Sequence, residues 1–144
     1  MHSEVEKAYL AGLIDGEGSI GIDAHGGLRV PSVRVTITNS CIELLEEIAW
    51  LWGGAVTTRR IRKFNWKATA DLRLGAKTAV DILEEIQPYL RIKKSQCQVA
   101  LDFAKTVNPK KHRSKALPLG VIQYREELRQ IMLALNKRGC APTS

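Results

Sequence analysis

The sequence has few cysteines, and their arrangement argues against two common structural devices. Only three are present, Cys41, Cys97 and Cys140, an odd number at wide separation. A disulfide framework needs cysteines that can pair, and a structural zinc site needs ligands at short, repeated spacings. The three histidines are scattered as well. We therefore expect neither a disulfide framework nor a zinc site, and we expect reduced cysteines.

Membrane-spanning and secretory segments are not visible either. The apolar run at residues 8–14 is far shorter than the roughly 20 residues that cross a bilayer, and the N-terminal M-H-S-E-V-E-K does not begin a secretory signal. No internal repeat is apparent. With 144 residues, 44% of them apolar, the chain can bury one core. We expect one domain, residues 1–144, that acts inside the cell, in the cytoplasm or an organelle, without a membrane partner.

Acidic residues are scarce relative to basic ones. The 15 Asp and Glu against 22 Lys and Arg give a net charge of +7, which favours a polyanionic partner such as nucleic acid over an ordinary solvated basic surface only if the charges cluster. They do cluster, in residues 57–73 and in the loop at 108–118, whose role stays open. The first cluster contains Arg59, Arg60, Arg62, Lys63, Lys67 and Arg73, against only Asp71.

An apolar helical run at residues 9–18, Y-L-A-G-L-I-D-G-E-G, ends in two carboxylates and two glycines. Ala8, Gly12 and Gly16 recur every four residues and so share one ridge of the helix. Because these residues have almost no side chain, a second backbone can approach the ridge closely. The pattern predicts a helix–helix interface there.

Glu17 follows this ridge at the expected end of the helix. If the second helix belongs to another copy of the chain across a twofold axis, two Glu17 carboxylates converge at the seam. Carboxylates at close range repel unless they share a cation, and hard oxygen ligands favour Mg²⁺ or a similar divalent ion. The alternative interpretation is a glycine-containing core helix with an acidic cap.

The letters of this segment carry a resemblance. Residues 10–18, L-A-G-L-I-D-G-E-G, are similar to the signature of the LAGLIDADG homing endonucleases and agree with it at seven of nine positions. The departures are Gly16 for Ala and Glu17 for Asp. The single copy of the motif implies one half of a paired active site.

The rest of the chain predicts two hairpins and further helices. Residues 19–25, 29–38 and about 55–74 alternate as strands do, and Ser3 with Glu6 and Ser40 with Glu43 match capping boxes. Helices are expected at 77–87, 94–107 and 119–137, the last packing on the core through a single stripe of residues. That stripe consists of Val121, Tyr124, Leu128, Ile131, Met132 and Leu135.

The polar faces of these strands are candidates for DNA contact, because a two-stranded ribbon fits the major groove; the competing interpretation is an ordinary solvated sheet face. The candidate DNA-binding residues are Ser32, Arg34, Thr36, Thr38, Arg59, Arg60, Arg62, Lys67, Thr69, Asp71 and Arg73. The resemblance implies the same arrangement: an α+β fold in the order α-β-β-α-β-β-α-α, with a saddle-shaped antiparallel sheet along the DNA and a two-helix dimer interface.

Two further site residues come from the resemblance. The segment Q-P-Y-L-R-I-K-K-S-Q from Gln87 is similar to a family segment that leads to an active-site lysine, which places that lysine at Lys93, with Lys94 as the neighbour that could be confused with it. Tyr89, Leu90 and Ile92 are expected to anchor the turn in the core, with Lys93 directed outwards. Asn39 aligns with a position that helps order metal-bound water, although helix capping is a competing role.

The resemblance implies a homodimeric endonuclease that cuts both strands of a long, nearly palindromic duplex. Glu17 and the carbonyl of Gly16 are expected to bind Mg²⁺, for which Mn²⁺ or another divalent ion can substitute, and Lys93 and Asn39 to assist catalysis. Asp15 is expected to support the helix end. The alternatives are an RNA-splicing maturase, with intron RNA as partner, a DNA-binding regulator that does not cleave, or a basic interaction module.

Overall fold

The computed structural model describes residues 2–23, 31–59, 68–107 and 119–138. Residues 24–30 and 60–67, within the two predicted hairpins, and the basic loop at 108–118 lie outside the described residues. The elements, in order, are α1 (Glu4–Glu17), β1 (Gly18–Asp23), β2 (Ser32–Asn39), α2 (Ile42–Trp52), β3 (Ala55–Thr58), β4 (Ala70–Gly75), α3 (Ala76–Ile86), the 3-10 turn η1 (Gln87–Tyr89), α4 (Lys94–Lys105) and α5 (Leu119–Arg138). The predicted α+β order is confirmed.

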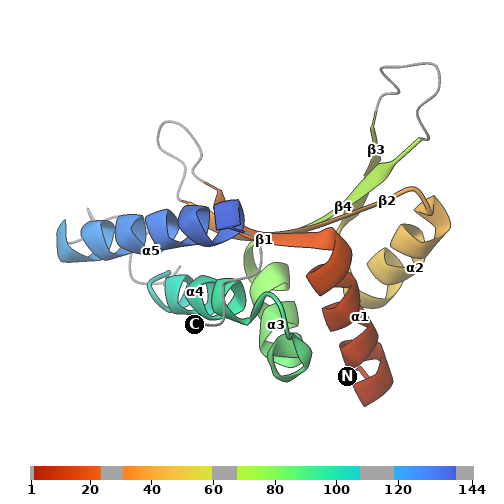
Figure 1. Ribbon diagram of the computed structural model, residues 1–144, viewed down its shortest axis with the longest axis horizontal. Helices are drawn as coiled ribbons and strands as arrows, with labels where there is room; N and C mark the ends of the chain where they lie inside the picture. The colour runs from red at the N-terminus through yellow and green to blue at the C-terminus, as the bar shows by residue number, and fades with distance from the viewer. Residues whose placement is uncertain (1, 24–30, 60–67, 108–118, 139–144) are drawn as a thin grey trace.

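The four strands form one antiparallel sheet in the order β1-β2-β4-β3. Side chains alternate between the two faces, so Val33, Val35 and Ile37 of β2 are buried while Arg34 and Thr36 point the other way. Figure 1 shows the curved sheet lying across the top of α1 to α4. The helices cover the apolar face, and the polar side chains lie on the opposite one.

The core lies between this apolar face and the helices. Leu10 and Ile14 of α1, Leu83 of α3 and Phe103 of α4 are almost completely buried there, and each such side chain contributes roughly 1.5 to 3 kcal/mol by leaving water. None of the described helices is both long and apolar enough to span a bilayer. Burial raises the pKa of the Cys97 thiol to about 12, so this free cysteine is protonated and unreactive at neutral pH.

One of the two predicted capping boxes is confirmed and the other is wrong. At the start of α1 the Glu6 amide donates to Ser3 Oγ (3.2 Å) and the Ser3 amide to Glu6 Oε2 (3.0 Å). Helix α2, by contrast, starts after Cys41, which makes no side-chain cap. The amide of Cys41, the residue before the helix, donates to Asn39 Oδ1 at 2.7 Å, so Asn39 and not a capping box at Ser40 holds the chain at the start of α2.

The predicted apolar stripe of α5 is only partly buried. Leu128 and Met132 reach the core, whereas Tyr124 and Ile131 are exposed, because α5 lies at the edge of the molecule beside α4 and β1 and is covered on one side only. Arg125 occupies the buried side instead. Its guanidinium donates to Thr106 Oγ1 (2.8 Å) and to the Thr106 carbonyl (2.6 Å), and burial lowers its pKa.

The junction between α1 and β1 leaves no room for a side chain. The Gly18 amide donates to the Ile14 carbonyl and closes the helix. A Cβ at Gly18 would lie 2.8 Å from Ile14 Cα and 3.0 Å from the Ile14 carbonyl oxygen, both backbone atoms that cannot move aside. Glycine is therefore what lets the chain pass from helix to strand directly after Glu17.

Replacing Gly18 with alanine should lower the free energy of unfolding by about 1 to 3 kcal/mol, the usual cost of forcing extra atoms into a packed site. The matched control is Gly120→Ala, because a Cβ there meets nothing within 4 Å and α5 should gain up to about 1 kcal/mol from the better helix former. Urea unfolding measures both. Equal effects of the two substitutions would contradict the close approach at Gly18.

Candidate active site

Glu17 is the last residue of α1, and its carboxylate is exposed at the point where the helix meets the sheet. The Asn39 side chain donates its Nδ2 hydrogen bond to Glu17 Oε2, while Asn39 Oδ1 accepts from the Cys41 amide. One amide group therefore orients the candidate metal ligand and also bonds the residue that precedes α2. Because α2 has no side-chain cap hydrogen bond, the helix-capping role weighed for Asn39 is not found, and its role toward water stays a prediction.

Lys93 lies at the same end of α1. Its Nζ donates to the Asp15 carbonyl at 2.8 Å, and the Asp15 carboxylate accepts from the Arg91 amide (2.8 Å) and the Lys93 amide (3.0 Å). Asp15 thus fastens the segment that carries Lys93 to the motif helix. Lys94 is exposed at the start of α4, so Lys93 is the lysine that this anchoring brings to the end of α1.

Two expectations for this segment are wrong in detail. The Lys93 side chain does not point away from the protein, because the last carbonyls of a helix lack partners within it and carry partial negative charge that attracts an ammonium group. Ile92 does not anchor the turn in the core, since 46% of it is exposed. Leu90 is buried as predicted, and Tyr89 is half-buried, with its hydroxyl donating to Glu4.

The ridge predicted on α1 is exposed in a single copy of the chain. Ala8, Gly12 and Gly16 all face solvent, and a Cβ on either glycine would meet nothing within 4 Å. Val5 and Tyr9, 78% and 55% exposed, extend the same face. In this single copy only the opposite side of α1 is buried, through Leu10, Ala11 and Ile14. The open ridge leaves room for another backbone.

On or beside the polar face of the sheet, the side chains of Arg34 and Arg59 are each fixed by a hydrogen bond to an aspartate. Arg34 Nε donates to Asp23 Oδ1 (2.8 Å), and its NH1 donates to Thr36 Oγ1 (2.9 Å). The guanidinium lies over Gly21, where a Cβ would be 2.7 Å from Arg34 NH2. The residue opposite Arg34 on β4 is Gly75, so both neighbouring strands leave space beside this side chain.

Arg59 and Asp71 form the second such group. Arg59 Nε donates to Asp71 Oδ2 (2.8 Å) and Thr38 Oγ1 to Asp71 Oδ1 (2.5 Å). Partial burial alone would raise the pKa of the Asp71 carboxyl, but the hydrogen bonds from Arg59 and Thr38 and the charges of Arg59 and Arg73 outweigh burial and lower it. Asp71 is therefore ionised at neutral pH.

The candidate DNA-binding residues that the structure describes lie together on this face or at its edge. Thr69 precedes β4, and its carbonyl accepts from the Arg59 amide at 2.8 Å. Arg60, Arg62 and Lys67 lie outside the described residues. Sequence reasoning missed the partnership of Asp23 with Arg34, since it depends on the register that pairs Gly21 with Arg34. The residues on this face are Ser32, Arg34, Thr36, Thr38, Asp71 and Arg73, with Arg59 and Thr69 at its edge.

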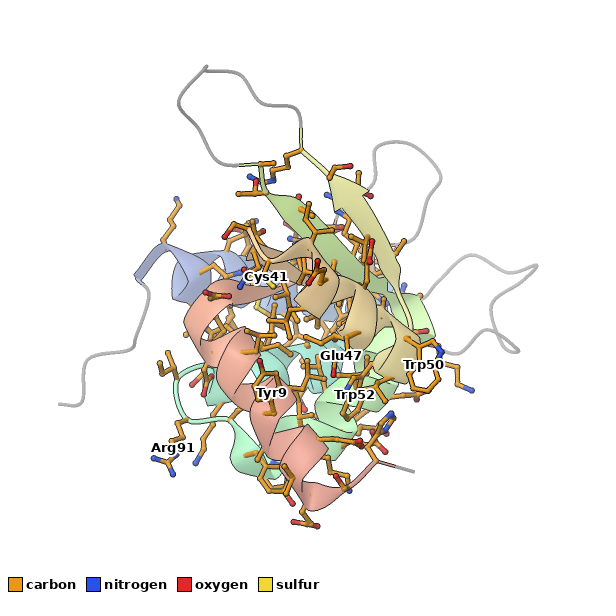
Figure 2. The ribbon with its side chains drawn as sticks, turned by 90° about the vertical axis from the view of Figure 1, so that its right-hand side faces the viewer. Tyr9, Cys41, Glu47, Trp50, Trp52 and Arg91 are labelled. Carbon is orange, nitrogen blue, oxygen red and sulfur yellow. The ribbon has the colours of Figure 1, made fainter. Side chains whose placement is uncertain are left out.

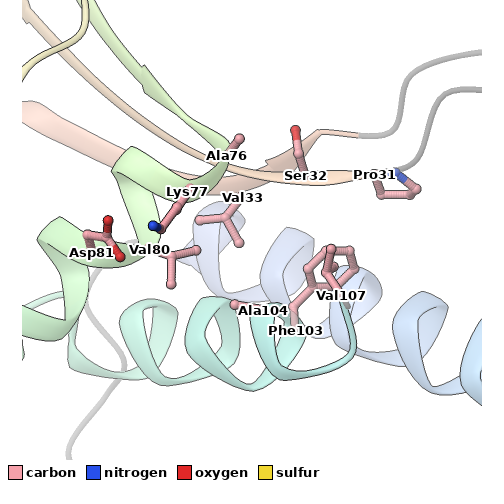
Figure 3. A pocket seen from close by; sticks show the side chains of 10 residues that line it. All are labelled: Pro31, Ser32, Val33, Ala76, Lys77, Val80, Asp81, Phe103, Ala104 and Val107. Atoms are coloured by element: carbon pink, nitrogen blue, oxygen red, sulfur yellow. The ribbon is translucent and has the colours of Figure 1, made fainter. Parts of the chain in front are cut away.

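An apolar cavity of about 490 Å³ lies on the other side of the sheet, between β2, α3 and α4 (Figure 3). Val33, Val80, Phe103 and Val107 are among its lining side chains, and Lys77 and Asp81 are its charged ones. No residue of α1 lines it. The cavity is separate from the site at Glu17, and its mostly apolar lining has few groups that could bind a phosphate.

Comparison with known proteins agrees with the motif and the fold. The sequence profile of the LAGLIDADG-like domain matches residues 4–87. No curated protein matches the chain in sequence.

Solved structures of similar fold include homing endonucleases described in complex with DNA. The archaeal intron-encoded homing endonuclease I-Vdi141I, complexed with DNA, is 17% identical, has a TM-score of 0.75, and the match covers 99% of this chain and 91% of that one. I-CvuI on a DNA target in the presence of Mg is 20% identical, with a TM-score of 0.71, and the match covers 92% of this chain and 82% of that one. I-GzeII with its DNA target is 17% identical, with a TM-score of 0.68, and the match covers 96% of this chain but 50% of that one. With the profile covering more than half of its residues, the chain belongs to the LAGLIDADG homing endonuclease family.

Proposed function

We propose that the chain is the single-domain subunit of a homodimeric, Mg²⁺-dependent endonuclease that cuts a specific DNA duplex. The observation that carries the proposal is the placement of Glu17: its exposed carboxylate stands at the end of an open helix ridge and next to the polar face of the sheet. A second copy on that ridge would bring two carboxylates to one place beneath bound DNA.

The donor atoms around Glu17 suit a hard divalent cation. Within the described residues, no cluster of three or more His, Cys, Asp or Glu side chains could hold a metal ion by itself. Mg²⁺ does not require one, because it commonly takes one or two carboxylates together with phosphate oxygens and water. Glu17 and the Gly16 carbonyl of each copy would hold the ion. It would neutralise charge on the scissile phosphate and lower the pKa of a bound water.

The protein's own groups supply the remaining requirements. Asn39 fixes the direction of the Glu17 carboxylate through its hydrogen bond. Lys93 Nζ donates one of its three N–H groups to the Asp15 carbonyl, which leaves two that can donate to a phosphate oxygen or to the attacking water. Because Asp15 holds the backbone of residues 91 and 93, this ammonium group is positioned before DNA arrives.

DNA recognition is assigned to the polar face of the sheet. Arg73 is exposed on β4, and a bidentate arginine contact to guanine gives about 1 to 3 kcal/mol of discrimination. Arg34 and Arg59 are restrained by Asp23 and Asp71, which limits the base-pair edges they can reach. The I-Vdi141I and I-CvuI structures, described as DNA complexes, support a duplex as the partner.

Length supports a paired arrangement. This chain covers 91% of the I-Vdi141I chain but only 50% of the I-GzeII chain, so two copies of it together match the larger protein in size. One chain brings one Glu17, and cutting both strands of a duplex needs a site at each scissile phosphate.

Glu17→Gln should abolish Mg²⁺-dependent cleavage and leave DNA binding largely intact, because the carboxylate serves the metal and not the groove. The target would first be selected by cleavage of a randomised palindromic library, and binding would be measured by gel shift in Ca²⁺. Glu127→Gln, an exposed glutamate on α5, is the control. Strong residual cutting by the Glu17 variant would refute the assignment.

Lys93→Ala should slow single-turnover cleavage by about 100-fold or more, the usual effect of removing a group that stabilises developing negative charge. Lys94→Ala should leave the rate nearly unchanged, because that side chain is exposed and absent from the hydrogen bonds around Asp15. Urea unfolding of both variants checks that the loss is not a folding defect. Equal rates for the two variants would remove Lys93 from the site.

Gly12→Leu should convert the dimer to a monomer, because a leucine on the ridge separates the two helices. Ala134→Leu adds a leucine to an exposed position of α5 and should have no effect on association. Sedimentation velocity reports the oligomeric state of each variant. A stable, active Gly12→Leu dimer would contradict the proposed interface.

A further inference from the structure

The exposed large apolar side chains of the described residues fall mainly into two groups. One lies along α5, and the other joins α1, α2 and the segment before α4. The second group consists of Val5, Tyr9, Trp50 and Ile92, and Trp50, with 84% of its surface exposed, is the most exposed of all. Single exposed apolar residues are ordinary, but a group of them flanking an open helix ridge is typical of an interaction surface.

The two flanks of α1 on this surface carry opposite charge. Helix α2 contains no Lys or Arg, and its exposed charges are three glutamates, Glu43, Glu46 and Glu47. On the other flank, residues 87–94 contain no Asp or Glu and end in R-I-K-K. Figure 2 shows Tyr9 of α1 with Glu47 and Trp50 to one side and Arg91 to the other. The face is therefore divided into an acidic and a basic half, with the ridge between them.

Only one of the two possible twofold arrangements pairs these halves. An axis running along α1 turns each copy so that α2 of one faces residues 91–94 of the other. An axis across α1 would instead set α2 against α2, where glutamates repel, and would separate the two Glu17 residues. The arrangement that brings the Glu17 carboxylates together is thus the one that brings the acidic α2 of each copy to the basic residues 91–94 of the other.

We propose that the α2 face of Glu46, Glu47 and Trp50 docks on the partner's Arg91–Lys94 segment, once on each side of the α1 pair. This inference rests on the proposed homodimer and extends it. The backbone amides of Arg91 and Lys93 donate to the Asp15 carboxylate. In the proposed dimer, α2 of one copy therefore contacts the segment that positions Lys93 in the other copy. Dimer formation therefore helps to order each catalytic lysine.

Trp50→Ala tests the apolar part of the contact. Trp50 is too exposed for its loss to unfold a single copy, so the effect falls on association. We expect the dimer dissociation constant, from sedimentation without DNA, to rise by at least about tenfold, as for truncation of a buried interface aromatic. Ile122→Ala on α5, where the side chain is 48% exposed, should leave the constant unchanged.

Charge reversal tests the polar part. Glu47→Arg and Arg91→Glu should each weaken the dimer, and the double variant should recover much of the loss, because each new arginine meets a new glutamate of the partner at unchanged net charge. Glu127→Arg combined with Arg91→Glu has the same net charge but should give no recovery.

Two outcomes would overturn the inference in distinguishable ways. If Gly12→Leu gives monomers while Trp50→Ala, Glu47→Arg and Arg91→Glu leave the dissociation constant unchanged, the helix pair stands and the flanking contact is wrong. If the unmodified protein is monomeric with and without DNA, the proposed homodimer fails and the flanking contact fails with it.

Discussion

The rest of this structure depends on one constraint: carboxylates stand at the C-terminal end of a helix, which already carries partial negative charge. Helix α1 ends with Asp15 and Glu17 and has no basic residue in its last turn, where the unpaired carbonyls already repel carboxylates. The Asp15 charge is offset by two backbone amides, and the Lys93 ammonium binds the Asp15 carbonyl. Among the residues that the structure describes, Glu17 accepts a hydrogen bond from the neutral amide of Asn39 alone. Its unbalanced charge is what a shared cation would neutralise.

The fold keeps that charge next to the polar face of the sheet. Because the helices bury one face of the sheet, the other is free to carry arginine, threonine and aspartate side chains at alternate positions of β2 and β4. Asp23 and Asp71 each hold an arginine in place. Gly18 fixes the step from α1 into β1, so the helix end proposed to bind a metal ion and the side of the sheet proposed to face DNA have a set relation.

Periodicity was enough to predict most elements and the faces of β2 and β4, because one buried side forces alternation on a strand. The motif selected Glu17 and the match around Gln87 selected Lys93, and the structure places both at the end of α1. The partners of the site residues could not be read from the sequence, since Asp23 meets Arg34, and Asp15 meets the Lys93 amide, through strand register and tertiary packing. For the same reason Ile92, expected in the core, is exposed.

The most direct test of the account is a crystal structure of the protein on its selected duplex in Ca²⁺, a divalent ion also present in the I-CvuI target complex. The account predicts two copies packed along α1, with both Glu17 carboxylates bound to cations beside the scissile phosphates. A complex in which those carboxylates lie far apart, or in which no ion stands between Glu17 and the DNA backbone, would contradict it.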